Sequence, residues 1–179
     1  MILEAAKKTA QAHGYGGLNF RDLALSVGIK SASIYYHFPG KAELGAAVAK
    51  RYREDSAAEL EALLATAGPQ ESLRQYPGTF RRTLESDNRM CLCSYMAAES
   101  DDLPEAVRTE AQGFADVNIA WLSKVLTAAG EASAEASMAK ARAIYAAIVG
   151  AQLLARSRAD LALYDTLIDS YRTAGLLPA

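Results

Sequence analysis

The sequence predicts an all-α protein, and three observations lead to that class. Alanine is abundant and recurs through long stretches with helical periodicity. The 12 glycines and 5 prolines lie mostly outside those stretches, and runs of β-branched residues are few. Hydrophobic residues make up 51% of the 179 positions and charged residues 22%, which is typical of a globular protein with its own core. We expect about nine helices, arranged as a small N-terminal module followed by a larger helical body.

The first two helices have clear local start and stop signals. Apolar residues at helical spacing predict a helix over residues 2–12, which His13 and Gly14 end. After the turn YGGL, Asn19 is placed as the N-cap of a short helix that extends to Val27, with Asp22 in its first turn.

A third short helix follows directly after a glycine. Gly28 ends the preceding helix, and Ser31 is expected to be the N-cap of the helix SASIYYHF, which Pro39-Gly40 ends. Two short helices that meet at a tight glycine turn are the pattern of a helix-turn-helix, in which the second helix enters the major groove of DNA.

The rest of the chain keeps the helical period. A long helix from Lys41 would link an N-terminal domain over residues 1–45 to a helical effector-binding and dimerisation domain over residues 46–179. The expected helices span residues 41–67, 70–86 with a bend or interruption at Pro77, 90–99, 104–129, 134–157 and 159–174.

Charge is distributed unevenly along the chain. Residues 1–53 carry eight Lys and Arg against three Asp and Glu, a net charge of +5, whereas the remainder carries eleven against eighteen, a net charge of −7. A basic module on an acidic body is expected when one part of a protein meets phosphate groups. The alternative is a chance asymmetry among solvated faces.

The N-terminal segment resembles the DNA-binding domain of the TetR family over about residues 2–48. The matching pieces are ILEAA, HGY, RDLALSVGI, SIYYHF and GKAEL. The resemblance implies a homodimer that binds a palindromic operator and leaves it, most simply as a repressor, when a small molecule binds its C-terminal helices. A cytoplasmic location is expected because no apolar run is long enough for a membrane span and the N-terminal pattern is amphipathic rather than that of a signal peptide. Family members usually carry several residues, often basic, before ILEAA, whereas ILEAA here follows directly after Met1. A DNA-contacting N-terminal arm is therefore not among the expected contacts.

The recognition helix carries the candidate DNA contacts. Short polar side chains at its start suit base edges, and residues farther along suit phosphates. Tyr35 and Phe38 have an alternative interpretation as core aromatics, and Ser31 and Ser33 as helix caps. The candidate DNA-binding residues are Asn19, Lys30, Ser31, Ala32, Ser33, Tyr35, Tyr36, His37 and Lys41.

Aromatic and isolated polar residues of the middle helices are candidates for an effector cavity. Phe114, Asn118 and Trp121 share one helix face, where a polar Asn needs a hydrogen-bond partner, either a ligand or a neighbouring backbone group. The stretch MCLCSYMAAESDDLP resembles the sixth helix of some TetR-type regulators. The candidate ligand-binding residues are Tyr76, Phe80, Met90, Cys93, Met96, Phe114, Asn118, Trp121 and Tyr145, and each has plain core packing as its alternative.

Cys91 and Cys93 are too close in sequence for an ordinary structural disulfide and lack the companion ligands of a zinc site. They point about 200° apart on a helix, so at most one faces a cavity. Buried free thiols are expected for both, and a sensor of oxidants or electrophiles is the alternative.

The last two helices carry the expected dimer contact, since small residues let helices approach closely. No membrane span, cofactor or metal site is predicted, and the motifs of metalloproteases, serine hydrolases and P-loop enzymes are absent from the sequence. A helical protein-interaction module without DNA is the second hypothesis. The candidate interface residues are Ala143, Ala147, Gly150, Ala151, Leu154, Leu161, Tyr164 and Ile168.

Overall fold

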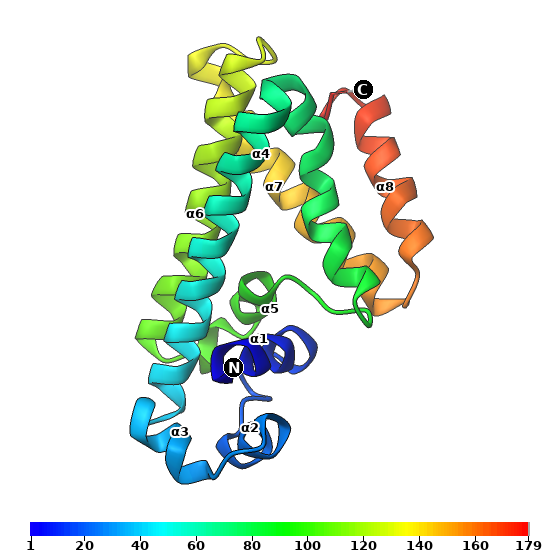
Figure 1. Ribbon diagram of the computed structural model, residues 1–179. Helices are drawn as coiled ribbons and strands as arrows, with labels where there is room; N and C mark the ends of the chain where they lie inside the picture. The colour runs from blue at the N-terminus through cyan, green and yellow to red at the C-terminus, as the bar shows by residue number, and fades with distance from the viewer. Residues whose placement is uncertain (179) are drawn as a thin grey trace. The chain divides into compact units, whose positions relative to one another are not determined.

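The computed structural model describes residues 1–178, and within that range the chain forms helices and no strands. The all-α prediction is therefore confirmed. Eight α-helices are present in the described range, and the predicted count of about nine is close because one of them consists of two segments. They are α1 (Ile2–His13), α2 (Phe20–Val27), α3 (Ser31–His37), α4 (Lys41–Glu85), α5 (Leu92–Ala98), α6 (Glu105–Ala128), α7 (Ala134–Ser157) and α8 (Leu161–Thr173), with a 3-10 turn at Ser100–Asp102 (Figure 1).

Helix α4 is divided at Gly68, where the backbone adopts φ 75° and ψ 172°. Only glycine enters this region readily, so the predicted break at this residue is confirmed. The interruption expected at Pro77 is wrong, because the helix continues through this residue. The Pro77 carbonyl oxygen instead accepts a hydrogen bond from the buried hydroxyl of Tyr164, at 2.8 Å.

Local capping sets several of the helix ends. Asn19 is the N-cap of α2, and Gly28 ends that helix in the left-handed conformation, both as predicted. The expectation that α8 starts near Ala159 is wrong. Asp160 accepts a hydrogen bond from the Leu163 N–H at 3.0 Å and caps the helix, so α8 begins at Leu161.

The chain divides into two compact units, and their boundary differs from the predicted one at residues 45 and 46. The first unit contains Met1–Asp55 together with Cys91–Phe114, and the second contains Ser56–Met90 and the chain from Ala115 onward. The segment 91–114, with α5 and the first half of α6, thus packs with the helix-turn-helix.

The first unit is built around a small core shared by helices α1 to α6. Side chains from α1, α2, α3, α4 and α5 are almost fully buried in it, including those of Ala6, Leu23, Ile34, Leu44 and Met96. This core fixes α3 through a single buried residue and leaves the remainder of that short helix toward solvent.

The second unit packs the parts of α4 and α6 that belong to it against α7 and α8. Its core includes Leu73, Leu122, Ile144 and Ile148, all fully buried. Gln152 is also fully buried, and its side-chain amide donates to the Phe80 carbonyl at 2.8 Å, which satisfies part of its hydrogen-bonding demand.

Within residues 1–178, one helix, α7, is long and apolar enough to cross a membrane by length and composition alone. Core helices of globular proteins meet the same criterion, and α7 contributes Ile144 and Ile148 to the core of the second unit.

Candidate DNA interface and ligand site

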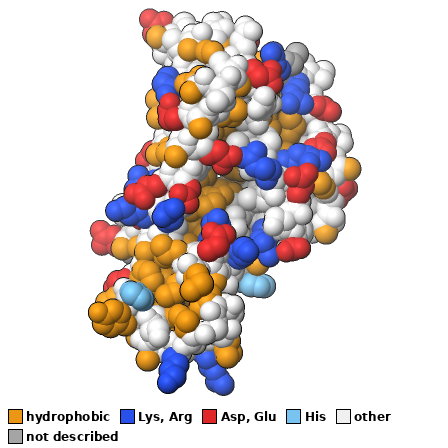
Figure 2. Space-filling model, in the orientation of Figure 1, with side chains coloured by type: hydrophobic (Ala, Val, Ile, Leu, Met, Phe, Trp, Pro, Cys, Tyr) orange, Lys and Arg blue, Asp and Glu red, His pale blue; other side chains and the backbone are white. Residues whose placement is uncertain are grey.

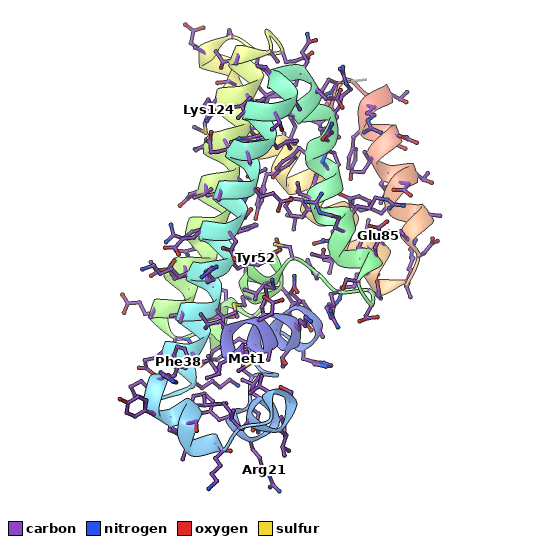
Figure 3. All side chains as sticks on the ribbon, viewed as in Figure 1. Met1, Arg21, Phe38, Tyr52, Glu85 and Lys124 are labelled. Atoms are coloured by element: carbon purple, nitrogen blue, oxygen red, sulfur yellow. The ribbon has the colours of Figure 1, made fainter. Side chains whose placement is uncertain are left out.

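Helix α3 presents nearly all of its side chains to solvent. Only Ile34 is buried, whereas Lys30, Ala32, Ser33 and His37 are exposed and Ser31 is half-buried. Tyr36 is the most exposed aromatic residue of the helix, at 86%. Lys and Arg side chains lie at the end of the first unit that carries α2 and α3 (Figure 2), and Arg21 of α2 extends away from the helices there (Figure 3). A short exposed helix with polar residues at its start has the form of a DNA recognition helix.

The start of α3 differs from the prediction. Lys30, with φ −79° and ψ 143°, is the N-cap, and Ser31 is the first helical residue. Helix α3 has no side-chain cap hydrogen bond, so the alternative interpretation of Ser31 and Ser33 as caps has no support in the structure.

Asn19 serves α2 as a cap. Its Oδ1 accepts hydrogen bonds from the Arg21 N–H at 2.8 Å and the Asp22 N–H at 3.3 Å. The side chain is exposed, so its role at DNA remains a prediction alongside an observed structural role.

Lys41 is already engaged with the loop between α1 and α2. Its Nζ donates to the Gly16 carbonyl at 3.0 Å and lies 4.6 Å from the centre of the Tyr15 ring. A cation placed in this way at the first residue of α4 adds to the positive potential of the helix N-terminus, where anions are favoured.

Tyr35 and Phe38, the two aromatic residues with an alternative interpretation as core residues, have different surroundings. Tyr35 is exposed, with its ring centre 4.6 Å from that of Phe20, whereas Phe38 is half-buried. Tyr35 therefore packs on the module with one face and remains accessible, so it is not a core aromatic residue.

Five of the predicted ligand-binding residues form a connected cluster in the second unit. The Tyr76 ring stacks on Trp121 with 5.5 Å between ring centres and meets Phe80 edge-on at 5.7 Å. Phe80 in turn contacts Tyr145 at 6.2 Å. The Tyr76 hydroxyl donates to Asn118 Oδ1 at 2.9 Å. Asn118 therefore has a side-chain partner, which differs from both the ligand and the backbone group considered above.

The nine predicted residues do not form one cavity. Cys93, Met96 and Phe114 belong to the first unit, where Phe114 stacks on Tyr52 at 5.3 Å. The common face of Phe114 with Asn118 and Trp121 on α6 is thus divided between two units, because α6 runs through both of them. Met90 is buried in the second unit.

Trp121 has an unsatisfied polar atom. Its side chain is 4% exposed, and the indole Nε1 is buried with no hydrogen-bond partner among the described residues. Trp121 also borders a groove of about 260 Å³ between α4 and α6. The other residues of this groove are not among the predicted ligand-binding residues; they are Ala57, Leu60, Glu61, Val117, Ala120 and Lys124.

Cys91 and Cys93 are both buried free thiols, as predicted. Burial raises the pKa of each thiol above its ordinary value, and the neighbouring Cys91 adds to the rise at Cys93. Thiolates are the reactive form, so this environment lowers the reactivity of both cysteines.

The predicted dimer residues on α7 and α8 fall into two groups. Ala151, Tyr164 and Ile168 are buried within the protomer, which corrects their assignment as contact residues. Ala143 is exposed, and Ala147, Gly150 and Leu161 are half-buried. Leu154 is exposed, as is Leu153 beside it, which is not among the predicted interface residues.

The comparisons with known proteins agree with this geometry. Residues 2–48 match the family model described as bacterial regulatory proteins of the tetR family. No curated protein matches the chain.

Solved structures match over almost the whole chain. A TetR transcriptional regulator from Legionella pneumophila is 31% identical, with a TM-score of 0.90, over 97% of this chain and 94% of that one. A TetR-family regulator from Agrobacterium tumefaciens is 29% identical, with a TM-score of 0.83, over 93% and 90%. The regulator FadR from Bacillus subtilis, solved in complex with stearoyl-CoA, shares the fold at 16% identity, with a TM-score of 0.69, over 94% of each chain.

Members of this family are DNA-binding transcriptional regulators rather than enzymes, and they bind operator DNA and small-molecule effectors as dimers. The exposed α3 of the helix-turn-helix, the match over residues 2–48 and the similarity over nearly the full length lead to one assignment. The chain belongs to the TetR family of bacterial transcriptional regulators.

Proposed function

We propose that this protein is a cytoplasmic, homodimeric repressor that leaves a palindromic operator when a small molecule binds its second unit. The observation that carries the DNA-binding part is the exposure of α3, whose polar N-terminal residues face solvent while Ile34 is its one buried residue. In this proposal Lys30, Ser31, Ala32 and Ser33 approach base edges.

The residues that follow would hold the register of the protein on DNA. Tyr35, Tyr36 and His37 lie along the exposed part of α3, and Lys41 lies at the N-terminus of α4. Contacts of this kind to phosphates carry no sequence information, and the cationic contact from Lys41 adds salt-dependent affinity.

The effector site is proposed around Tyr76, Asn118 and Trp121. A buried N–H without an acceptor costs about 1–3 kcal/mol, and a ligand that supplies an acceptor to Trp121 would remove that cost. The stacked rings of Tyr76 and Trp121 favour a ligand that is mainly apolar. FadR was solved with stearoyl-CoA, a ligand with a long apolar acyl chain, and an effector with an apolar part is proposed here on the same fold.

Trp121 provides the measurement, since it is the only tryptophan in the chain. Compounds that release operator DNA in an anisotropy assay should also change Trp121 emission and its quenching by iodide. Trp121→Phe keeps an aromatic ring and removes the N–H, so it should still bind operator but need more of the same compound for release. A compound that releases DNA with unchanged emission, and equally well from Trp121→Phe, would remove Trp121 from the effector site.

A further inference from the structure

Glu99 connects α5 to the helix-turn-helix module from a distant part of the sequence. One carboxylate oxygen accepts a hydrogen bond from the Tyr15 N–H at 2.6 Å, and the other accepts from the Gly16 N–H at 3.4 Å. Both donors lie in the loop between α1 and α2, and the carboxylate is half-buried against it.

The position of Glu99 is unfavourable within its own helix. It is the C-cap of α5, where the free carbonyl groups of the last turn give a partial negative charge that disfavours a carboxylate. The two N–H groups of the α1–α2 loop supply the compensation, because hydrogen bonds to an ionised acceptor are stronger than neutral ones. The glutamate at this position is therefore stabilised by its tertiary contact with the loop and not by its own helix.

The contact between Glu99 and the loop also requires glycine at residue 14. Its φ of +68° favours glycine, and a Cβ at this position would overlap with Cε1 of Tyr95 and with both carboxylate oxygens of Glu99. The close approach between the loop and α5 thus depends on the absence of a side chain at residue 14.

The other side of the loop is held by α4. Lys41 donates to the Gly16 carbonyl and lies over the Tyr15 ring, so Glu99 and Lys41 contact the same two residues. One turn farther along α4, a Cβ at Gly45 would lie 2.8 Å from Tyr15 Cε2, so this helix also passes close to the loop.

We propose that Glu99 is a positioning residue for DNA binding. By holding the N–H groups of Tyr15 and Gly16, it fixes the loop whose carbonyl and ring orient the Lys41 ammonium group, and it so determines how Lys41 meets a DNA phosphate. The inference rests on the proposed phosphate contact of Lys41. Glu99 makes no DNA contact of its own, because its carboxylate would repel phosphate.

This role predicts an effect opposite in sign to simple electrostatics. Removing a negative charge near DNA should strengthen binding if only long-range repulsion mattered. If Glu99 positions Lys41, Glu99→Gln should weaken binding even though the protein becomes more positive. Glu99→Asp should weaken binding as well, because it keeps the charge but shortens the side chain by one methylene.

Binding of the full-length protein to double-stranded DNA as a function of salt tests the proposal. Asp101→Asn is the matched control, since Asp101 is an exposed acid two residues away with the same change in charge. We expect Glu99→Gln and Glu99→Asp to weaken binding at least about fivefold, within the usual range of coupling between sites. The slope of log affinity against log salt should fall by about 1, as for Lys41→Ala. Asp101→Asn should bind as well as the wild type or better.

A double variant separates positioning from an independent effect. Glu99→Gln combined with Lys41→Ala should bind no more weakly than Lys41→Ala alone, because Glu99 acts through Lys41. The amide protons of Tyr15 and Gly16 should also exchange slowly with solvent in the wild type and faster in Glu99→Gln, at an unchanged melting temperature.

Wild-type affinity and salt slope in Glu99→Gln would overturn the inference, as would additive losses in the double variant. An unchanged salt slope in Lys41→Ala would overturn it too, but as long as the wild type binds DNA, the proposed function is not contradicted. If the wild type does not bind DNA at all, the proposed function itself is contradicted.

Discussion

Tyr36 and Lys41 differ in what they must give up to contact DNA. The Tyr36 side chain is largely exposed, with its ring edge-on to His37 at 5.2 Å between ring centres, so the proposed contact of its hydroxyl with a phosphate would not require it to leave a buried site. Lys41 already donates to the Gly16 carbonyl. An ammonium group has three donors, so Lys41 can keep this bond while a second hydrogen contacts phosphate.

The two residues should therefore fail in different ways. Lys41→Ala removes a cation, so affinity should fall for all DNA sequences alike and the salt slope should drop by about 0.9 for one lost phosphate contact. Tyr36→Phe removes a neutral donor, so affinity should fall with the slope unchanged.

Ser33→Ala serves as the comparison, because a base-contacting residue should alter sequence preference rather than the salt slope. Titrations at four salt concentrations distinguish these patterns. Equal slopes for wild type and Lys41→Ala would remove Lys41 from the phosphate contacts.

At the scale of single residues, the interactions that could be predicted from the sequence are local ones. Asn19 caps a helix two and three residues ahead, so its partners could be predicted from spacing alone. The bond between Tyr76 and Asn118 joins residues 42 apart, and Glu99 reaches 84 residues back to Tyr15. No local pattern contains such pairs, since they depend on how the helices pack.

At the scale of the helices, backbone conformation at glycine decides where elements end. Gly28 ends α2 with φ 72°, and Gly68 divides α4 with φ 75°. Both ends could be predicted because glycine is the residue that adopts this conformation cheaply. Pro77 led to the wrong prediction of an interruption, because the sequence does not show that the surrounding helix of the second unit continues through it.

A pair of glycines tests this account. A Cβ at Gly28 and a Cβ at Gly78 would each meet no atom within 4 Å, but only Gly28 has a positive φ. Gly28→Ala should lower the free energy of unfolding by about 1 kcal/mol through backbone strain. Gly78→Ala, inside α4, should raise it by up to about 1 kcal/mol, since alanine favours helix more than glycine does. Urea unfolding measures both values, and changes of the same sign would show that φ is not the deciding factor.

For the whole molecule, the central question is how two protomers meet. Exposed apolar side chains on α7, Leu153 and Leu154, are 50% and 45% accessible in the protomer. Gly150 lies on the same helix, and a Cβ there would contact nothing within 4 Å. This surface is compatible with the proposed two-fold contact, in which the same patch of each protomer faces its copy.

Gly150→Leu tests that contact without disturbing the protomer. A leucine has space within the protomer and favours helix more than glycine does, so stability of the isolated chain should not fall, whereas a packed dimer should lose about 1–3 kcal/mol through overpacking. Ala162→Leu, at an exposed position of α8 outside the predicted contact residues, is the control and should leave the dimer intact. Sedimentation equilibrium reports the shift toward monomer. A Gly150→Leu dimer as strong as that of Ala162→Leu would place the interface elsewhere.

The fold class of the molecule could be predicted from the sequence, whereas its division into two units could not. The all-α class and the helix-turn-helix follow from periodicity, caps and glycine positions within short windows. The grouping of Cys91–Phe114 with the first 55 residues could not be predicted, because it depends on contacts between α1 and α5. The same long-range packing separated Phe114 from Trp121, although both lie on α6.

Selection of DNA from a random double-stranded pool by the full-length protein tests the central claim most directly. The account predicts enrichment of a two-fold symmetric sequence whose half-sites lie about 34 Å apart, or a multiple of that spacing, because each protomer of a dimer presents one α3. Repeating the selection with Ser33→Ala should change bases within both half-sites, whereas Tyr36→Phe should enrich the same sequence at lower affinity. Absence of any enriched sequence, or an enriched sequence that Ser33→Ala leaves unchanged, would contradict the assignment of α3 as the helix that contacts bases.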